Sequence, residues 1–175
     1  MIDLLNISHD NSDQLEKIMN WKSNEILCDN IMAEPVSLTF QETKDWVQKN
    51  STDKNQELKG IFYREKANDP VIFLGVIRLM FIDDNANTAE VGLYIGDSSL
   101  RGKKIGKNAL KQLIEVYAKE RNINKLHARI RVSNNVSLKL FRSLNFTQEG
   151  FLKNHYYSKL DKTFDDVILM ARFMS

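Results

Sequence analysis

The feature that most constrains the fold is a change of hydrophobic period in the middle of the chain. Three segments rich in Ile, Val, Phe and Tyr, at 58–64, 71–82 and 89–96, are separated only by polar turns. This pattern predicts three consecutive antiparallel strands. Before and after them the apolar residues recur at helical spacing, so the strands and helices together predict a mixed α/β domain.

The other elements follow from the same two periods. A strand is expected at 2–7 and a helix from about Ser12 to Trp21. A second helix is expected to start at Thr39, because Thr39 and Glu42 have the spacing of a capping box. Later elements are a helix at 105–120 (Ile105, Ala109, Leu113, Val116 and Tyr117 on one face), a strand at 125–132, a helix at 134–144 that buries Val136, Leu140, Phe141 and Leu144, and strands at 146–151 and 167–173. We expect a single domain over residues 1–175.

Composition narrows the class of protein. The 175 residues suffice for one domain with a substantial core. The 25 Lys and Arg against 23 Asp and Glu leave a charge of +2, which gives no reason to expect a nucleic acid or membrane partner. Cys28 is the lone cysteine, and His9, His127 and His155 are scattered, so no metal is expected. With no signal-like start and no long apolar run, a cytoplasmic protein is expected, either monomer or homodimer.

A basic segment with glycines, 96–107, connects the strand at 89–96 to the helix at 105–120. A helix N-terminus carries unsatisfied N–H groups and a partial positive charge, which favour an anion. Gly102 and Gly106 allow the backbone to approach a ligand closely. Four cations lie nearby, at Arg101, Lys103, Lys104 and Lys107. The segment lacks both Gly-Lys-Ser/Thr and Gly-x-Gly-x-x-Gly, so it predicts another kind of phosphate-binding loop, with a solvated basic turn as the alternative.

The same segment resembles the coenzyme loop of the GNAT superfamily of N-acetyltransferases, Arg/Gln-x-x-Gly-x-Gly/Ala. Arg101 and Gly106 match its ends, and Lys104 replaces the middle glycine. A second segment, 134–146, resembles Asn-x-x-Ser/Ala-x-x-Leu-Tyr-x-x-x-Gly-Phe, with Phe141 in place of the tyrosine and Asn145 in place of the glycine. The resemblance implies a GNAT fold, with a mixed, mostly antiparallel sheet of about seven strands and about four helices. It also implies acetyl-CoA as cosubstrate.

The resemblance further implies a coenzyme site. Backbone N–H groups near Ile95 and Gly96 would pair with the pantetheine and stabilise the oxyanion. Asn134 is expected to cap the helix that follows it and, by resemblance, to contact the coenzyme. The full expected set is Ile95, Gly96, Arg101, Gly102, Lys103, Lys104, Ile105, Gly106, Lys107, Asn134, Ser137 and Phe141.

Two residues of the strand at 89–96 are candidates for proton transfer. An amine attacks a thioester only when neutral, and an amine of pKa ~10.4 is neutral about once in 10³ molecules at pH 7. Alternation puts Glu90, Gly92 and Tyr94 on one face. Glu90 stands where the family carries a catalytic glutamate and is the candidate base, against a solvated sheet carboxylate. Tyr94 would protonate the thiolate or hold the acceptor, against simple packing.

The acceptor is indicated only by resemblance. The segments around Trp21 and Lys22, 36–46 and 149–157 resemble the branch with ribosomal-protein N-terminal and nucleotide-amino-sugar acetyltransferases. Trp21 would stack on a base or sugar and Lys22 would meet a phosphate, and the alternative for Trp21 is that it packs beneath the sheet at the end of its helix. We expect a small-molecule amine, in particular a nucleotide-linked amino sugar. A protein N-terminus, a polyamine, an antibiotic or a non-catalytic coenzyme-binding role stay open.

Overall fold

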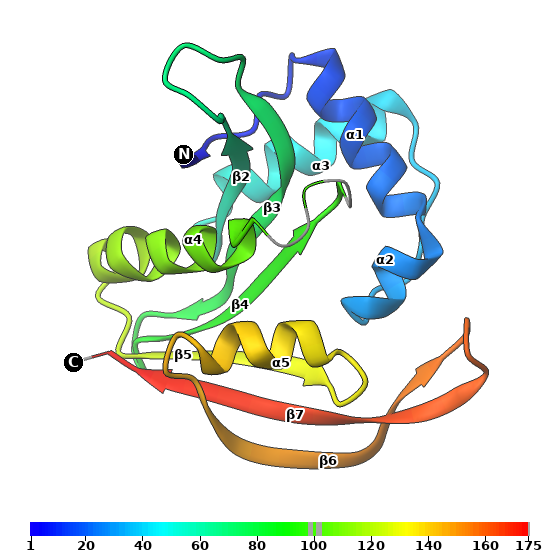
Figure 1. Cartoon of the computed structure of the whole chain (residues 1–175), viewed down its shortest axis with the longest axis vertical. Coiled ribbons are helices and arrows are strands. Elements are labelled where there is room, and N and C mark those ends of the chain that lie inside the picture. The colour runs from blue at the N-terminus through cyan, green and yellow to red at the C-terminus, as the bar shows by residue number, and fades with distance from the viewer. Residues whose placement is uncertain (98–99, 101–102, 175) are drawn as a thin grey trace.

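The computed structural model describes residues 1–97, 100 and 103–174. Seven strands in this part of the chain form one sheet, in the order β1-β2-β3-β4-β5-β7-β6 (Figure 1). Only β4 and β5 are parallel neighbours, which confirms the mixed, mostly antiparallel sheet. The strands are β1 (Ile2–Leu5), β2 (Glu57–Tyr63), β3 (Ile72–Asp83), β4 (Thr88–Ile95), β5 (Lys125–Arg131), β6 (Thr147–Ser158) and β7 (Thr163–Phe173).

Helices cover both faces of the sheet. They are α1 (Ser12–Ser23), α2 (Glu25–Asn30), α3 (Phe40–Thr52), α4 (Ile105–Gln112) with its π-helical continuation η2 (Leu113–Ala118), and α5 (Asn135–Arg142). Side chains of α1 and α3 share a core with β2 and β3 on one face. Those of α4, η2 and α5 fill a larger core on the other. None of the helices in the described ranges has the length and hydrophobicity needed to cross a bilayer.

The short helix α2 was not predicted. Its six residues carry no helical period, because Ile26 is exposed while Cys28 and Asp29 are buried. Asn24 ends α1 and also starts α2, where its side chain accepts a hydrogen bond from the Leu27 N–H at 2.9 Å. A local cap, rather than an apolar stripe, therefore defines this helix.

The predicted start of α3 is confirmed. The Thr39 N–H donates to Glu42 Oε2 at 2.8 Å, and the Glu42 N–H donates to Thr39 Oγ1 at 3.3 Å. Two expected core residues are exposed, however. Val116 is 38% exposed, because the wider π-helical turn brings Ile114 and Ala118 to the core instead. Val136 is 80% exposed, because it lies in the first turn of α5, ahead of the residues that pack on the sheet.

The sheet separates in its centre. β4 and β5 pair only from Thr88 to Glu90, although both strands continue for several residues (Figure 1). On the other side of β4 the Gly96 N–H donates to the Leu74 carbonyl of β3 at 2.8 Å. Because backbone direction alternates along a strand, the N–H of Ile95 points instead towards the gap beside β5. An unpaired strand edge thus lines one side of this opening.

Candidate active site

A cavity of about 380 Å³ fills the space where β4 and β5 separate. The lining comes from the end of α2 and the chain that follows it, from β3, β4 and β5, and from α5 and β6. It includes Arg78, Glu90, Tyr94, Arg129, Asn134, Ser137, Phe141, His155 and Tyr156. Five of the residues singled out from the sequence lie here together: Glu90, Tyr94, Asn134, Ser137 and Phe141. The structure therefore brings the proton-transfer candidates and the second motif to one place.

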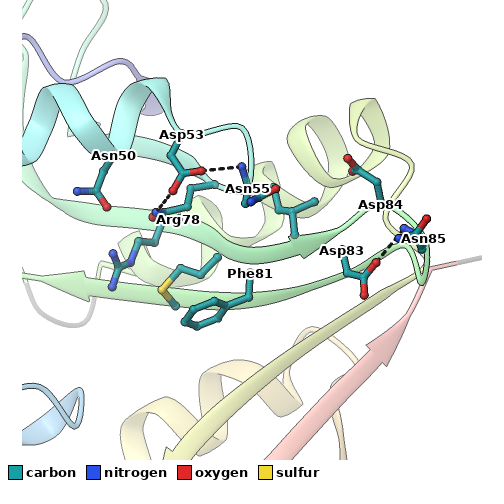
Figure 2. A pocket seen from close by; sticks show the side chains of 11 residues that line it. Asn50, Asp53, Asn55, Arg78, Phe81, Asp83, Asp84 and Asn85 are labelled. Atoms are coloured by element: carbon teal, nitrogen blue, oxygen red, sulfur yellow. Dashed lines mark hydrogen bonds between the residues drawn. The ribbon is translucent and has the colours of Figure 1, made fainter.

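A larger cavity of about 700 Å³ adjoins this one, between the end of α3 and the turn after β3 (Figure 2), and shares Arg78, Met80 and Phe81 with it. Its carboxylates have local partners, since Asp53 accepts from the Asn55 N–H at 2.9 Å and Asp83 from the Asn85 N–H at 2.8 Å. None of the residues expected to act in catalysis or binding lines it. We therefore place the chemistry in the smaller cavity.

Glu90 is buried at the point where β4 leaves β5. Its Oε1 accepts a hydrogen bond from Arg129 Nε at 3.1 Å, and its Oε2 lies 3.8 Å from His127 Nε2. Burial lowers the pKa of His127 from its usual range, and the charge of Glu90 opposes that shift. Glu90 is thus an anchored carboxylate in the cavity wall, rather than a solvated one on the sheet surface.

Tyr94 lies four residues after Glu90 on β4, on the same face of the strand. Its ring meets that of Trp21 edge-on, with centroids 5.8 Å apart. Its hydroxyl oxygen is buried and has no hydrogen-bond partner among the residues described. Burial raises the pKa of Tyr94, while Arg78 opposes the shift. The hydroxyl therefore keeps its proton at neutral pH, as a proton donor must.

The start of α4 has the features of an anion site. The first helical hydrogen bond runs from the Asn108 N–H to the Lys104 carbonyl at 3.0 Å, so the N–H groups of Ile105, Gly106 and Lys107 precede it. Within the described ranges no side chain caps this end. Lys104 itself is left-handed, with φ of 57°. That conformation explains why the family motif has glycine at this position.

The other residues of the loop differ in their surroundings. Arg101 and Gly102 lie outside the described residues. Lys103 is held near Glu65, with 3.8 Å between Nζ and Oε1. A side chain on Gly106 would contact Leu140 and Leu93 at ordinary distances of 3.5 and 3.6 Å. A Cβ would therefore fit at this position, and the packing of α4 on α5 and β4 does not itself require glycine.

The backbone near Ile95 and Gly96 is only partly available. The Gly96 N–H, expected to face the coenzyme, already donates to Leu74 within the sheet. A Cβ on Gly96 would stand 2.0 Å from the Trp21 ring, so this glycine is needed for packing. The Ile95 N–H, which points to the gap, is the better candidate donor.

The second motif forms the expected cap. Asn134 Oδ1 accepts from the Ser137 N–H at 3.1 Å, and Asn134 Nδ2 donates to the Asn30 carbonyl at 3.2 Å. The cap thus connects α5 to the end of α2. Phe141 is buried against Phe146, with ring centroids 4.9 Å apart, and supplies no hydroxyl to the cavity. Asn145 is left-handed, with φ of 64°, as its place after the helix predicts.

Trp21 and Lys22 lie at the end of α1. Trp21 is 9% exposed and packs on Phe73 with centroids 5.0 Å apart, which favours the packing interpretation over a freely stacking ring. Lys22 Nζ lies 4.0 Å from the centroid of the Trp46 ring. Both residues line a small cavity of about 90 Å³ beside the active-site cavity.

Three polar residues of this region, Arg78, Arg129 and Asp29, were not predicted from the sequence. A signal for Arg78 existed, because it is a charged residue within an otherwise apolar strand. Asp29 accepts hydrogen bonds from Arg131 and from the Tyr156 hydroxyl, which connects α2 to β5 and β6. Burial and Asp29 together raise the pKa of Tyr156 to about 12. No group of three or more His, Cys, Asp or Glu suited to a metal occurs in the ranges that the structure describes.

Comparison with known proteins identifies the family. Residues 7–147 match the profile of the acetyltransferase (GNAT) domain. Curated relatives include the uncharacterized protein MJ1062 of Methanocaldococcus jannaschii, 30% identical over 78% of this chain and 27% of that protein. Another is the ribosomal-protein-serine acetyltransferase of Escherichia coli, 34% identical over 58% of this chain and 55% of that protein. The alignments span 27% to 59% of the lengths of four curated relatives.

Solved structures share the fold. The spermidine N-acetyltransferase of Vibrio cholerae, in complex with CoA and spermine, has a TM-score of 0.82 at 20% identity, covering 98% of this chain and 95% of that one. The ribosomal L7/L12 acetyltransferase RimL, in complex with coenzyme A, has a TM-score of 0.82 at 22% identity, with coverages of 99% and 94%. The acetyltransferase MccE, in complex with acetyl-CoA and AMP, has a TM-score of 0.79 at 22% identity, with coverages of 99% and 92%. With its family profile, both motifs and this architecture, the chain belongs to the GNAT acetyltransferase family.

Proposed function

We propose that this chain is an acetyl-CoA-dependent N-acetyltransferase that acts on a primary amine. The proposal rests on the separation of β4 from β5. Glu90 lies where the two strands stop pairing, and α4 begins beyond the other end of β4. Structures with this fold bind CoA or acetyl-CoA. The proposal assigns each end of the opening a separate task.

The coenzyme side uses mostly backbone groups. The N–H groups of Ile105, Gly106 and Lys107 suit a pyrophosphate, because they precede the first helical hydrogen bond and carry the positive end of the helix dipole. Lys104 and Lys107 have no ion-pair partner within the described ranges and add positive charge. Arg101, Gly102 and Lys103 complete the proposed loop. Asn134, Ser137 and Phe141 line the cavity, and with the Ile95 N–H we assign them to the rest of the coenzyme.

The acceptor side handles the protons. As the amine nitrogen bonds to the thioester carbonyl carbon and the C–S bond breaks, Glu90 takes the proton that the nitrogen loses, through a bridging water. Tyr94 supplies a proton to the departing sulfur, since its hydroxyl lines the cavity, is protonated at neutral pH and has no hydrogen-bond partner among the described residues. Phe141 cannot do this, because it has no ionisable group.

The finer proposal for the acceptor is a nucleotide-linked amino sugar. The named relatives differ in their acceptors, with spermidine for one and ribosomal protein for others, so the acceptor must be argued from this chain. Lys22 lies beside the cavity and suits a phosphate better than an ammonium. The complex of MccE with AMP shows that this fold accommodates a nucleotide.

An acceptor screen that measures free thiol release tests both the proposed acetyltransferase activity and the proposed class of acceptor. Amino-sugar nucleotides, peptides with free N-termini and polyamines are compared at one acetyl-CoA concentration. Amine-dependent release of thiol supports the enzyme proposal, and preference for amino-sugar nucleotides supports the finer one. Thiol release with peptides alone would contradict the amino-sugar proposal and indicate a protein N-terminus as the acceptor. If acetyl-CoA binds but no amine causes thiol release, a non-catalytic binding role would be favoured.

A further inference from the structure

The small cavity beside the active-site cavity has an unusual set of polar groups. It measures about 90 Å³ and is lined by two cations, Lys22 and Arg78, by the rings of Trp21 and Trp46, and by Tyr94. The two cavities share five lining residues, which are Ile31, Ala33, Val76, Arg78 and Tyr94. A group bound in the small cavity would therefore lie next to the reacting amine.

Arg78 reaches this place because of its position on β3. It lies opposite Gly92 of β4, whose missing side chain leaves room for the Arg78 and Met80 side chains. Its guanidinium points away from the carboxylates of Asp53 and Asp83 in the neighbouring cavity (Figure 2). Across the described part of the chain, Arg78 has no ion-pair or hydrogen-bond partner. Its five N–H donors are thus left for a ligand.

Lys22, like Arg78, carries a positive charge that no carboxylate of the described residues pairs with. Its ammonium lies over the Trp46 ring and has no ion-pair partner in residues 1–97, 100 and 103–174. Burial lowers the pKa of Lys22, and the charge of Arg78 lowers it further. Lys22 and Arg78 therefore repel each other, and no anionic side chain lies between them in the described part of the chain. An anion bound between them would relieve this repulsion, so the small cavity is suited to an anionic group.

The nearby carboxylates offset this charge only in part. Burial lowers the pKa of Arg78, and the charges of Tyr94 and Glu90 oppose that shift without forming an ion pair or hydrogen bond with Arg78 in the described part of the chain. Glu90 is held by Arg129 at 3.1 Å, and Glu34, which also lines the small cavity, pairs with Lys159 at 2.7 Å. Buried beside the cations is the Tyr94 hydroxyl, which has no partner among described residues and can donate a hydrogen bond. The local surplus is therefore positive, with a neutral donor beside it.

We propose that Arg78, together with Lys22, binds a carboxylate or phosphate group of the acceptor. The inference rests on the proposed function and narrows its substrate class to amines that carry an anionic group, which excludes simple polyamines. A polyamine would place two or more ammonium groups beside Arg78 and Lys22, where like charges repel. Arg78 is the residue that reads this group, because a planar guanidinium binds either anion in a bidentate manner.

Anion binding can be measured without turnover, because the chain's two tryptophans both line the small cavity. Tryptophan fluorescence is titrated with inorganic phosphate, acetate or spermidine, each against sodium chloride at equal ionic strength. We expect a saturable change with phosphate or acetate, and the stronger of the two identifies the group. Arg78→Gln should weaken it about tenfold to a hundredfold, and Lys22→Gln should weaken it less. The matched control Lys49→Gln removes an exposed charge from α3 and should leave it unchanged.

Two outcomes would overturn the inference. One is a saturable response to spermidine and to neither anion, and the other is an anion response that Arg78→Gln and Lys22→Gln leave intact. Turnover separates this inference from the proposed function. If the enzyme acetylates an anionic amine, Arg78→Gln should raise the KM for that amine at least tenfold and leave the KM for acetyl-CoA unchanged. Arg78-dependent anion binding without acetylation of any amine would support this subsite and contradict the proposed function, whereas efficient acetylation of spermidine by the wild-type enzyme would do the reverse.

Discussion

The coenzyme side and the acceptor side of this molecule are built in different ways. The coenzyme side relies on local backbone features: the start of α4, the left-handed Lys104 and the Asn134 cap. The acceptor side relies on side chains that come from α1, α2, β3 and β6 and meet only in the folded chain. Short sequence motifs encode the first kind of site, whereas several residues of the second, such as Arg78 and Asp29, belong to no motif.

The largest effect is expected at Arg131, which holds the acceptor side together. This buried residue donates to Asp165 at 2.9 Å and also to Asp29, so it connects β5 to β7 and α2. Arg131→Met leaves both carboxylates without their cation and should lower the free energy of unfolding by about 3–5 kcal/mol. Urea denaturation measures this change. Arg142→Met, at an exposed site on α5, is the control and should change it by less than about 0.5 kcal/mol. Equal losses of stability in Arg131→Met and Arg142→Met would contradict the view that buried side-chain contacts hold the acceptor side together.

A catalytic effect is expected at Glu90. Glu90→Gln keeps the shape of the side chain and removes the base, so kcat at neutral pH should fall about 10²-fold. Activity should partly return at alkaline pH, where more of the acceptor is already neutral. An unchanged pH profile of kcat would make Glu90 a structural partner of Arg129. Tyr94→Phe removes only the hydroxyl, and a larger loss there than in Glu90→Gln would move the main proton transfer to Tyr94.

A smaller effect is expected at the loop, where Lys104 departs from the family pattern. Lys104→Gly should stabilise the fold by about 1 kcal/mol, because the left-handed backbone is unfavourable for a residue with a side chain. The same substitution at Lys107, inside α4, should instead destabilise by up to about 1 kcal/mol. Thermal denaturation of the two variants should therefore show shifts of opposite sign. Shifts of the same sign would mean that the backbone at Lys104 carries no strain.

The smallest effect concerns His127 beside Glu90. Burial lowers the pKa of His127 below its usual 6.5, so the unfolded chain takes up this proton at a higher pH than the folded chain does. Stability should therefore decline as the pH falls below 6.5, until the folded-state pKa is passed. The urea midpoint measured one unit above and one unit below 6.5 should differ more in wild type than in His127→Gln. An identical difference would show that His127 does not contribute.

Much of the fold was predictable because it depends on period and caps. The three central strands, the Thr39 capping box and the Asn134 cap are local patterns, and each was found where predicted. The exposure of Val116 was not predictable, because the π-helical turn leaves no mark in the spacing of apolar residues. Glu90 could be chosen from alternation and resemblance, but its partner Arg129 depends on the pairing of β4 with β5. Arg78 is noticeable in the sequence as a charged residue in an apolar strand. Its place in the cavity could not be predicted, because it depends on the pairing of Arg78 with Gly92 across β3 and β4.

The central claim, that acetyl-CoA binds at the start of α4, has a direct test with a matched pair of variants. At a hundredfold excess over Kd, acetyl-CoA should stabilise wild type by ~2.7 kcal/mol, seen as a rise in Tm. Gly106→Ala should keep this rise, because a Cβ fits beside Leu93 and Leu140 at ordinary contact distances. Gly106→Trp should lose it, because the ring blocks the backbone N–H groups. Equal protection of all three proteins would contradict the assignment of the coenzyme site.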